Sequence, residues 1–140
     1  MRNSLLPLTV ITLLVSPLKA VPLTLSCPHQ NITFQIEVAH TPKERKKGLM
    51  FRKILPQDTG MLFSYEKPTP VAMWMKNTYV PLDIIFVDAK GAILALYEST
   101  TPHSLTPIGP VEGTVHALEV GGGTIQAHKI TPECVLRLEK

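Results

Sequence analysis

The chain has 140 residues, of which 44% are hydrophobic and 18% are charged. This length suits one domain, and the balance excludes both a disordered chain and a protein that is apolar throughout. Its 13 prolines exclude a coiled coil or another long-helix protein, and the formal net charge is +3.

The first twenty residues have the layout of a secretory signal peptide. A positive residue, Arg2, precedes an uncharged apolar run over residues 5–15, and the segment ends on Ala20. The alternative is an uncleaved membrane anchor, but the run is about half the length that a spanning helix needs. We expect cleavage after Ala20 and an exported domain over residues 21–140, either periplasmic or secreted. No later segment is long enough to cross a bilayer.

Removing residues 1–20 takes away Arg2 and Lys19, which leaves 12 of the 14 basic residues against 11 acidic ones. Half of the remaining basic residues lie between Lys43 and Lys53. Only one aromatic residue, Phe51, lies among them, so the segment lacks the pattern of a nucleic-acid reader. We interpret it as a solvated face and expect no nucleic-acid partner. Contact with anionic phospholipid or a cell-wall polymer is the alternative.

Two cysteines, Cys27 and Cys134, lie near opposite ends of the expected domain. In an oxidising compartment an even count favours a disulfide, which here requires the first and last strands to be neighbours. The alternative is a pair of free thiols for redox or metal chemistry, which no CxxC spacing supports.

After residue 20 the chain has short apolar segments separated by proline and glycine, the pattern of a β-sandwich or barrel. Apolar and polar residues alternate over residues 32–38, which predicts a half-buried strand. Thr41 is suited to be a helix N-cap, with Pro42 at the first helical position and Glu44 completing a capping box. Gly48 is suited to end this short helix.

The middle of the chain predicts four more strands. Two are expected over residues 60–65 and 71–75, and the Lys-Pro-Thr-Pro segment 67–70 is expected to break the chain between them. Residues 82–87 and 92–98 are joined by an Asp-Ala-Lys-Gly turn, so we expect them to pair as an antiparallel hairpin.

The last third begins with a proline- and glycine-rich segment, residues 99–113, which is expected to hold no long regular element. It is either a flap over a site or a plain surface loop. A strand over 115–120, a glycine turn, a short helix over 124–129 and a strand over 134–138 follow. The expected fold is therefore mainly β: a compact antiparallel sandwich or barrel-like single domain with one or two short helices.

A series of short motifs, taken in order, resembles one family. The motifs are Gly48-Leu49-Met50-Phe51-Arg52, Gly60-Met61-Leu62-Phe63, Trp74-Met75-Lys76-Asn77-Thr78, Pro81-Leu82-Asp83-Ile84-Ile85-Phe86 with the turn after it, and Ala117-Leu118-Glu119-Val120 with a glycine-rich turn. Their order resembles the family called domain of unknown function 192 (DUF192) over residues 32–138. The resemblance implies a compact, mainly β domain, often behind a signal peptide or anchor, with no established biochemical activity.

The chain departs from the family pattern near its end. Where the family usually shows Gly-Asp before the last strand, this chain has Glu133-Cys134. Together with Cys27, this departure favours a Cys27–Cys134 disulfide as a local addition to the family fold.

The strongest group of candidate site residues surrounds Trp74. If Trp74 and Met75 lie on a strand, Trp74 and Lys76 share one face. One interpretation is a small polar pocket walled by Trp74 that binds a ligand such as a sugar. The alternative is a salt bridge and turn network that stabilises the fold. The candidate ligand-binding residues are Arg52, Trp74, Lys76, Asn77, Thr78, Asp83 and Glu119.

Asp83 lies in an otherwise apolar strand, so its carboxylate needs a partner. The cations available to it are Lys76, Arg45 and Arg52. Glu119 lies in another predicted strand, and its carboxylate also needs a partner. With Asp83 it could form the carboxylate pair of a glycoside hydrolase, which is our enzymatic alternative.

Four methionines lie between residues 50 and 75, and they raise a third hypothesis. Thioethers suit Cu(I), which an exported protein meets. Met73 and Met75 share a face at strand spacing, although core methionines have the same spacing, and the family has apolar residues at Met50, Met61 and Met75. The histidines show no HxH or HxxxH spacing, and only His116, within a strand, is worth testing. We expect no bound metal and no cofactor.

The sequence also lacks a GxSxG nucleophile motif and a phosphate-binding glycine loop. Our leading hypothesis is an exported cell-envelope domain that acts as a non-catalytic module. It would contact a small polar ligand or an envelope protein around Trp74, Asn77 and Asp83. The alternatives are a carbohydrate hydrolase that uses Asp83 and Glu119, and a copper-binding protein.

Overall fold

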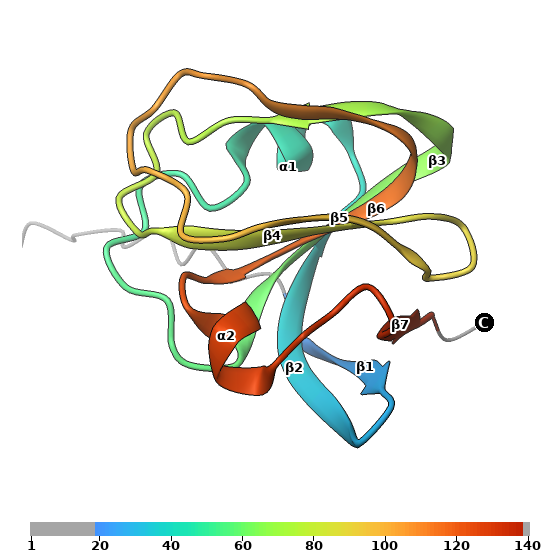
Figure 1. The fold of residues 1–140 in the computed structure, drawn as a ribbon. Helices are drawn as coiled ribbons and strands as arrows, with labels where there is room; N and C mark the ends of the chain where they lie inside the picture. Colours follow the sequence, from blue (N-terminus) through green and yellow to red (C-terminus); the bar gives the residue numbers. More distant parts are fainter. Residues whose placement is uncertain (1–18, 139–140) are drawn as a thin grey trace, which may run out of the picture.

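The computed structural model describes residues 19–138, so the expected signal peptide over residues 1–20 lies almost wholly outside the described residues. The fold is mainly β, as predicted, and Figure 1 shows a strongly curved sheet flanked by two short helices. The seven strands follow the order β5-β4-β6-β3-β2-β1-β7. Within the described range, no helix is long and apolar enough to span a membrane.

The elements have the following bounds: β1 Val21–Cys27, β2 Gln30–Ala39, α1 Pro42–Lys47, β3 Thr59–Met73, β4 Leu82–Val87, β5 Ile93–Tyr97, β6 Ile108–Gly121, α2 Thr124–His128 and β7 Val135–Arg137. Neighbouring strands are antiparallel except β2 and β3, which are parallel. The helix α1 and the loop after it form the connection between these two parallel strands.

The two edges of the sheet meet, so the sheet is a nearly closed barrel. At one edge β7 pairs with β1, and at the other an isolated bridge joins Ala92, just before β5, to Val135 of β7. The Gly91 carbonyl accepts a hydrogen bond from the Leu136 N–H at 2.8 Å, and the lack of a side chain at Gly91 allows this close approach. A Cβ at Gly91 would lie 2.0 Å from the Leu136 carbonyl oxygen, so a larger residue would open this contact.

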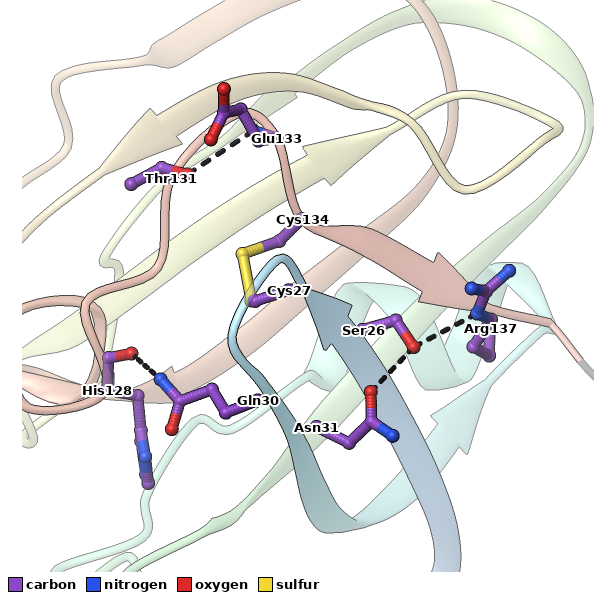
Figure 2. The surroundings of a disulfide bond; sticks show 9 residues. All are labelled: Ser26, Cys27, Gln30, Asn31, His128, Thr131, Glu133, Cys134 and Arg137. Atoms are coloured by element: carbon purple, nitrogen blue, oxygen red, sulfur yellow. Dashed lines mark hydrogen bonds between the residues drawn. A yellow bond between two sulfur atoms is a disulfide. The ribbon is translucent and has the colours of Figure 1, made fainter.

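The predicted disulfide is present and lies next to this closure. Cys27 at the end of β1 is bonded to Cys134 immediately before β7, and Figure 2 shows the two strands side by side. Beside the bridge, Ser26 Oγ donates to Asn31 Oδ1 and accepts from Arg137 Nε. The first and last strands are therefore joined by the disulfide, by the antiparallel pairing of β1 with β7 and by a side-chain network.

The central strands β3, β4 and β6 are buried on both faces, which creates two cores. One core combines residues from six of the seven strands with Ile125 of α2, and it fills the barrel. The other lies on the opposite face and is covered by the segment after α1 and the loop after β3, which contribute Leu49 and Met75. Successive residues on β3, β4 and β6 therefore point alternately into the first core and into the second.

Several predicted elements are confirmed. The helix α1 has the predicted capping box, because Thr41 Oγ1 accepts from the Glu44 N–H at 3.1 Å and Glu44 Oε2 accepts from the Thr41 N–H at 3.0 Å. Pro42 is its first residue, and Gly48 is its C-cap with a φ of 48°. The predicted hairpin is β4–β5.

Two predictions about proline are wrong. The segment 67–70 does not break the chain, because β3 runs without interruption through Pro68 and Pro70. The expected loop 99–113 is also shorter, since β6 begins at Ile108 and contains Pro110. The β3–β6 ladder shifts register several times after Ser64, so the prolines lie where regular pairing does not require their missing N–H groups.

Candidate functional site

A cavity of about 320 Å³ lies between α1, β3 and β6, under the loop that follows β3. This volume is at the lower end of the range for ligand pockets, roughly 300–1,000 Å³. We call it the Glu119 cavity, and its most informative lining residues are Arg45, Tyr65, Met73, Trp74, Thr78 and Glu119.

Glu119 comes from the buried centre of β6 and is 4% exposed. Its ladder partners are Met61 on β3 and Ile84 on β4, both of them core residues. None of the hydrogen bonds among the described residues involves its carboxyl group, whose oxygens are not sealed from the cavity that the residue lines. Burial raises the pKa of Glu119 to about 8, so the group is mostly protonated at pH 7 and can donate a hydrogen bond.

Tyr65 and Arg45 line the same cavity. The Arg45 guanidinium is 4.9 Å from the centroid of the Tyr65 ring, and it donates to the carbonyls of His40 and Ser64. Burial raises the pKa of Tyr65, and the neighbouring Glu119 raises it further, while Arg45 opposes the change. The cavity thus combines a neutral phenol and a neutral acid with a cation that the backbone holds in place.

Trp74 forms the outer wall of the cavity. Because β3 ends at Met73, Trp74 lies in the following loop, and the expectation that Trp74 and Lys76 share a strand face is wrong. They still meet, since Lys76 Nζ lies 5.0 Å from the Trp74 ring centroid. Asn77 turns the loop with a φ of 51°.

The loop that carries Trp74 is held from two sides. Residues 98–107 contact it through the Met75 N–H, which donates to the Ser104 carbonyl at 3.0 Å, and the His103 N–H, which donates to the Thr78 carbonyl at 3.1 Å. On the other side, the Phe51 N–H donates to the Asn77 carbonyl at 2.8 Å. The wall of the cavity is therefore built from three segments that are distant in sequence.

Asp83 faces the other side of the sheet. It pairs with Val120 in the β4–β6 ladder, whereas Glu119 pairs with Ile84, so the two carboxyl groups point to opposite faces. They do not form the facing pair that glycoside hydrolysis requires. The expected cation partner of Asp83 is also wrong, because its two oxygens accept the backbone N–H groups of Ser99 at 2.7 Å and Ile125 at 2.8 Å.

Arg52 is the remaining candidate, and it forms an ion pair with Glu37 outside the cavity. Of the seven predicted ligand-binding residues, the structure therefore brings Trp74, Thr78 and Glu119 together around the cavity. Lys76 and Asn77 lie on the outer side of Trp74, while Arg52 and Asp83 lie elsewhere.

The methionines divide between two places. Met50 and Met73 line the cavity, whereas Met61 and Met75 are buried in the core, where Met75 Sδ accepts from the Thr100 hydroxyl at 3.1 Å. Within residues 19–138, no three His, Cys, Asp or Glu side chains are grouped as a metal site would require.

His116 is part of a polar pair at the rim of the barrel. Its Nδ1 lies 2.7 Å from Ser64 Oγ, and the two residues are direct partners across the β3–β6 ladder. Burial lowers the pKa of His116, which favours the neutral ring at pH 7. It lies on the opposite face of β6 from Glu119, so it does not contribute to the cavity.

Sequence reasoning missed Arg45 and Tyr65 as site residues. The strand period carries a partial signal, since Met61, Phe63 and Tyr65 share one face of β3. Placing Tyr65 near Glu119 also needs the pairing of β3 with β6, and nothing local in the sequence identifies that pairing.

Comparison with known proteins finds relatives whose function is not established. The family model of DUF192, described as "Uncharacterized ACR", matches residues 25–138. A crystal structure of a protein of unknown function from Novosphingobium aromaticivorans DSM 12444 is 35% identical, with a TM-score of 0.84, covering 89% of each chain. A second, from Sinorhizobium meliloti 1021 and provisionally described as a transcription regulator, is 33% identical with a TM-score of 0.81. That match covers 87% of this chain and 97% of the other. No curated protein matches.

Proposed function

The chain belongs to the DUF192 family, and we propose that it is a non-catalytic module that binds a small polar ligand in the Glu119 cavity. The observation that supports this most directly is a buried carboxyl group, 4% exposed, that lines a cavity without a hydrogen-bond partner among the described residues.

An acid among core residues is an unusual choice for a side chain whose role is only to fold. An apolar residue would suit the Met61 and Ile84 neighbours better, whereas the carboxyl group of Glu119 lines the cavity and is open to a ligand. A ligand with an acceptor opposite the Glu119 hydroxyl would satisfy this group. The aromatic and thioether walls, Trp74, Tyr65 and Met73, would pack on the apolar part of the same ligand.

The composition of the cavity supports a binding role over the glycoside hydrolase alternative. Glu119 is the one carboxyl group among the residues known to line it, and Asp83 is on the far side of the sheet. A single acid supplies a hydrogen-bond donor, whereas general acid–base hydrolysis of a glycoside uses two flanking carboxyl groups.

We also propose that the domain is exported to the periplasm or secreted. Its support is the signal-like layout of the first twenty residues, together with a disulfide that persists best in an oxidising compartment.

Isothermal titration calorimetry with a panel of monosaccharides and hydroxy acids tests the cavity. We expect at least one compound to bind, and Glu119→Met, which keeps side-chain length but removes the acid, to weaken it about tenfold. Glu119→Gln keeps a donor in place and should bind within a few-fold of the wild type. Glu112→Gln, on the exposed side of the same strand, is the matched control. Unchanged affinity in Glu119→Met, or no binding across the panel, would contradict the proposal.

A further inference from the structure

We propose that the Glu119 cavity is one end of a longer site, which continues over Trp74 into a lysine-lined groove and takes an acidic oligosaccharide. The cavity end of this site rests on the function proposed above. The groove end is new, and it adds residues that do not line the cavity, among them Lys43 and Lys76.

The groove and the cavity are adjacent. A groove of about 540 Å³ lies on the outer side of Trp74. Four of its lining residues also line the cavity, so the two hollows share one wall and a longer ligand can extend over it from one to the other. The shared residues are Lys46, Lys47, Met50 and Trp74.

The charge of this surface favours an anion. Lys43, Lys46, Lys47 and Lys76 line the groove, and no acidic residue is among its lining residues. The first three come from α1 and the fourth from the loop after β3, so the lysines face the groove from two directions. In the cavity, Arg45 adds another cation while Glu119 is mostly protonated at pH 7. An anion thus meets favourable charge along the whole site.

The exposed aromatic residues favour an oligosaccharide as the ligand, rather than a lipid bilayer. Trp74 is 45% exposed and Phe51 is 60% exposed, and both line the groove. Sugar rings have apolar faces that pack on such side chains while their carboxylates reach the lysines. A lipid bilayer could meet the lysines, but its flat surface would not reach Glu119 at the floor of the cavity. The cavity end therefore favours a ligand with a narrow terminal group that can reach Glu119.

Calorimetry with matched saccharides tests this assignment. We expect trigalacturonate to bind about tenfold more tightly than both galacturonate and the methyl ester of trigalacturonate, which has the same length without the charges. The double variant Lys43→Gln/Lys76→Gln, in exposed residues that line only the groove, should remove this advantage and leave galacturonate binding unchanged. Lys90→Gln, in the β4–β5 turn, removes a distant exposed lysine and should change nothing.

Each other outcome has a distinct meaning. If galacturonate binds but trigalacturonate binds no more tightly, the extended site is wrong and the cavity proposal stands. If the methyl ester binds as well as the acid, the anionic class is wrong. Equal losses in Lys90→Gln and the groove variant, or tighter binding to phosphatidylglycerol vesicles or single-stranded DNA, would indicate a general polyanion surface and overturn the assignment. If no saccharide binds, both proposals fail for this ligand class.

Discussion

Two buried carboxyl groups lie on neighbouring strands, and their environments differ. Asp83 is 0% exposed, and its two oxygens accept two backbone N–H groups, so its hydrogen-bonding needs are met by the protein itself. Glu119 has apolar ladder partners and no such donors among the described residues, and burial raises its pKa to about 8. At the scale of single residues, Asp83 therefore serves as an acceptor for the backbone, whereas Glu119 becomes a donor facing a cavity.

The stability of the protein should fall with rising pH because of Glu119. Between its ordinary pKa of 4.5 and its native value of about 8, the folded state holds a proton that the unfolded state has lost. The free energy of unfolding therefore decreases across this window, by an amount on the order of 5 kcal/mol. Chemical denaturation below and above the window should show this decrease in the wild type, relative to Glu119→Gln.

Glu112→Gln is the control for that measurement, because Glu112 is exposed on the same strand. Its pH profile should run parallel to that of the wild type. If Glu119→Gln also follows the wild-type profile at every pH, the acid is not the source of the pH dependence.

At the scale of elements, α2 depends on a side chain from another strand. Its N-cap, Gly123, has no side chain to accept the first N–H groups of the helix. Asp83 of β4 accepts the Ile125 N–H instead, and its other oxygen accepts the Ser99 N–H in the loop after β5. One carboxylate thus joins β4, α2 and that loop, which explains why a charge is present inside an apolar strand.

Asp83→Asn should lower the free energy of unfolding by about 2–3 kcal/mol, because one of the two backbone donors would lose its acceptor. Asp88→Asn is a matched control. Asp88 also accepts two backbone N–H groups, from Lys90 and Ala92, but it uses one oxygen for both, and asparagine retains that oxygen. Urea denaturation of both variants makes the comparison. Similar losses in the two would mean that Asp83 has no special role.

At the scale of the whole molecule, the barrel is closed by contacts between the ends of the chain. The disulfide joins residues 107 positions apart, and the Ala92–Val135 bridge lies next to it. A covalent link across most of the domain limits the unfolded ensemble as well as supporting the folded one. It also connects the stability of the fold to the redox state of its compartment.

The full chain, expressed in a Gram-negative host, should be recovered from the periplasm as a polypeptide that begins at Val21 and has no free thiol. Mass spectrometry and thiol titration measure both properties. Reducing the disulfide should lower the free energy of unfolding by about 4–5 kcal/mol, and Cys27→Ser/Cys134→Ser should match the reduced protein. Recovery from the cytosol with residues 1–20 retained would contradict the export proposal.

The parts of the fold that the sequence predicts depend on residues close together in the chain. The capping box of α1 involves Thr41 and Glu44, three residues apart, and the β4–β5 hairpin follows from a four-residue turn. The alternation in β2 likewise marks its buried face without knowledge of its neighbours. The cysteine pairing was accessible for another reason, because two cysteines allow only one bridge.

The prolines show where local reasoning stops. Pro68 and Pro70 predict a break, yet β3 continues through them because the partner strand β6 shifts register at the same place. The candidate site also depends on contacts between residues that are far apart in the sequence. Trp74 and Glu119 are notable in the sequence, but Tyr65 and Arg45 join them only through the pairing of β3 with β6 and the packing of α1.

The sequence by itself therefore determined the fold class, the short helix, the hairpin and the disulfide, all of which depend on local pattern or on simple counting. The tertiary structure decided which face of the sheet each buried acid occupies. That choice depends on strand register, since a shift of one residue in β4 or in β6 would move the carboxyl group of that strand to the other face of the sheet. Register is set by contacts between residues far apart in the chain, and for this reason the cavity emerges only when the strands are assembled.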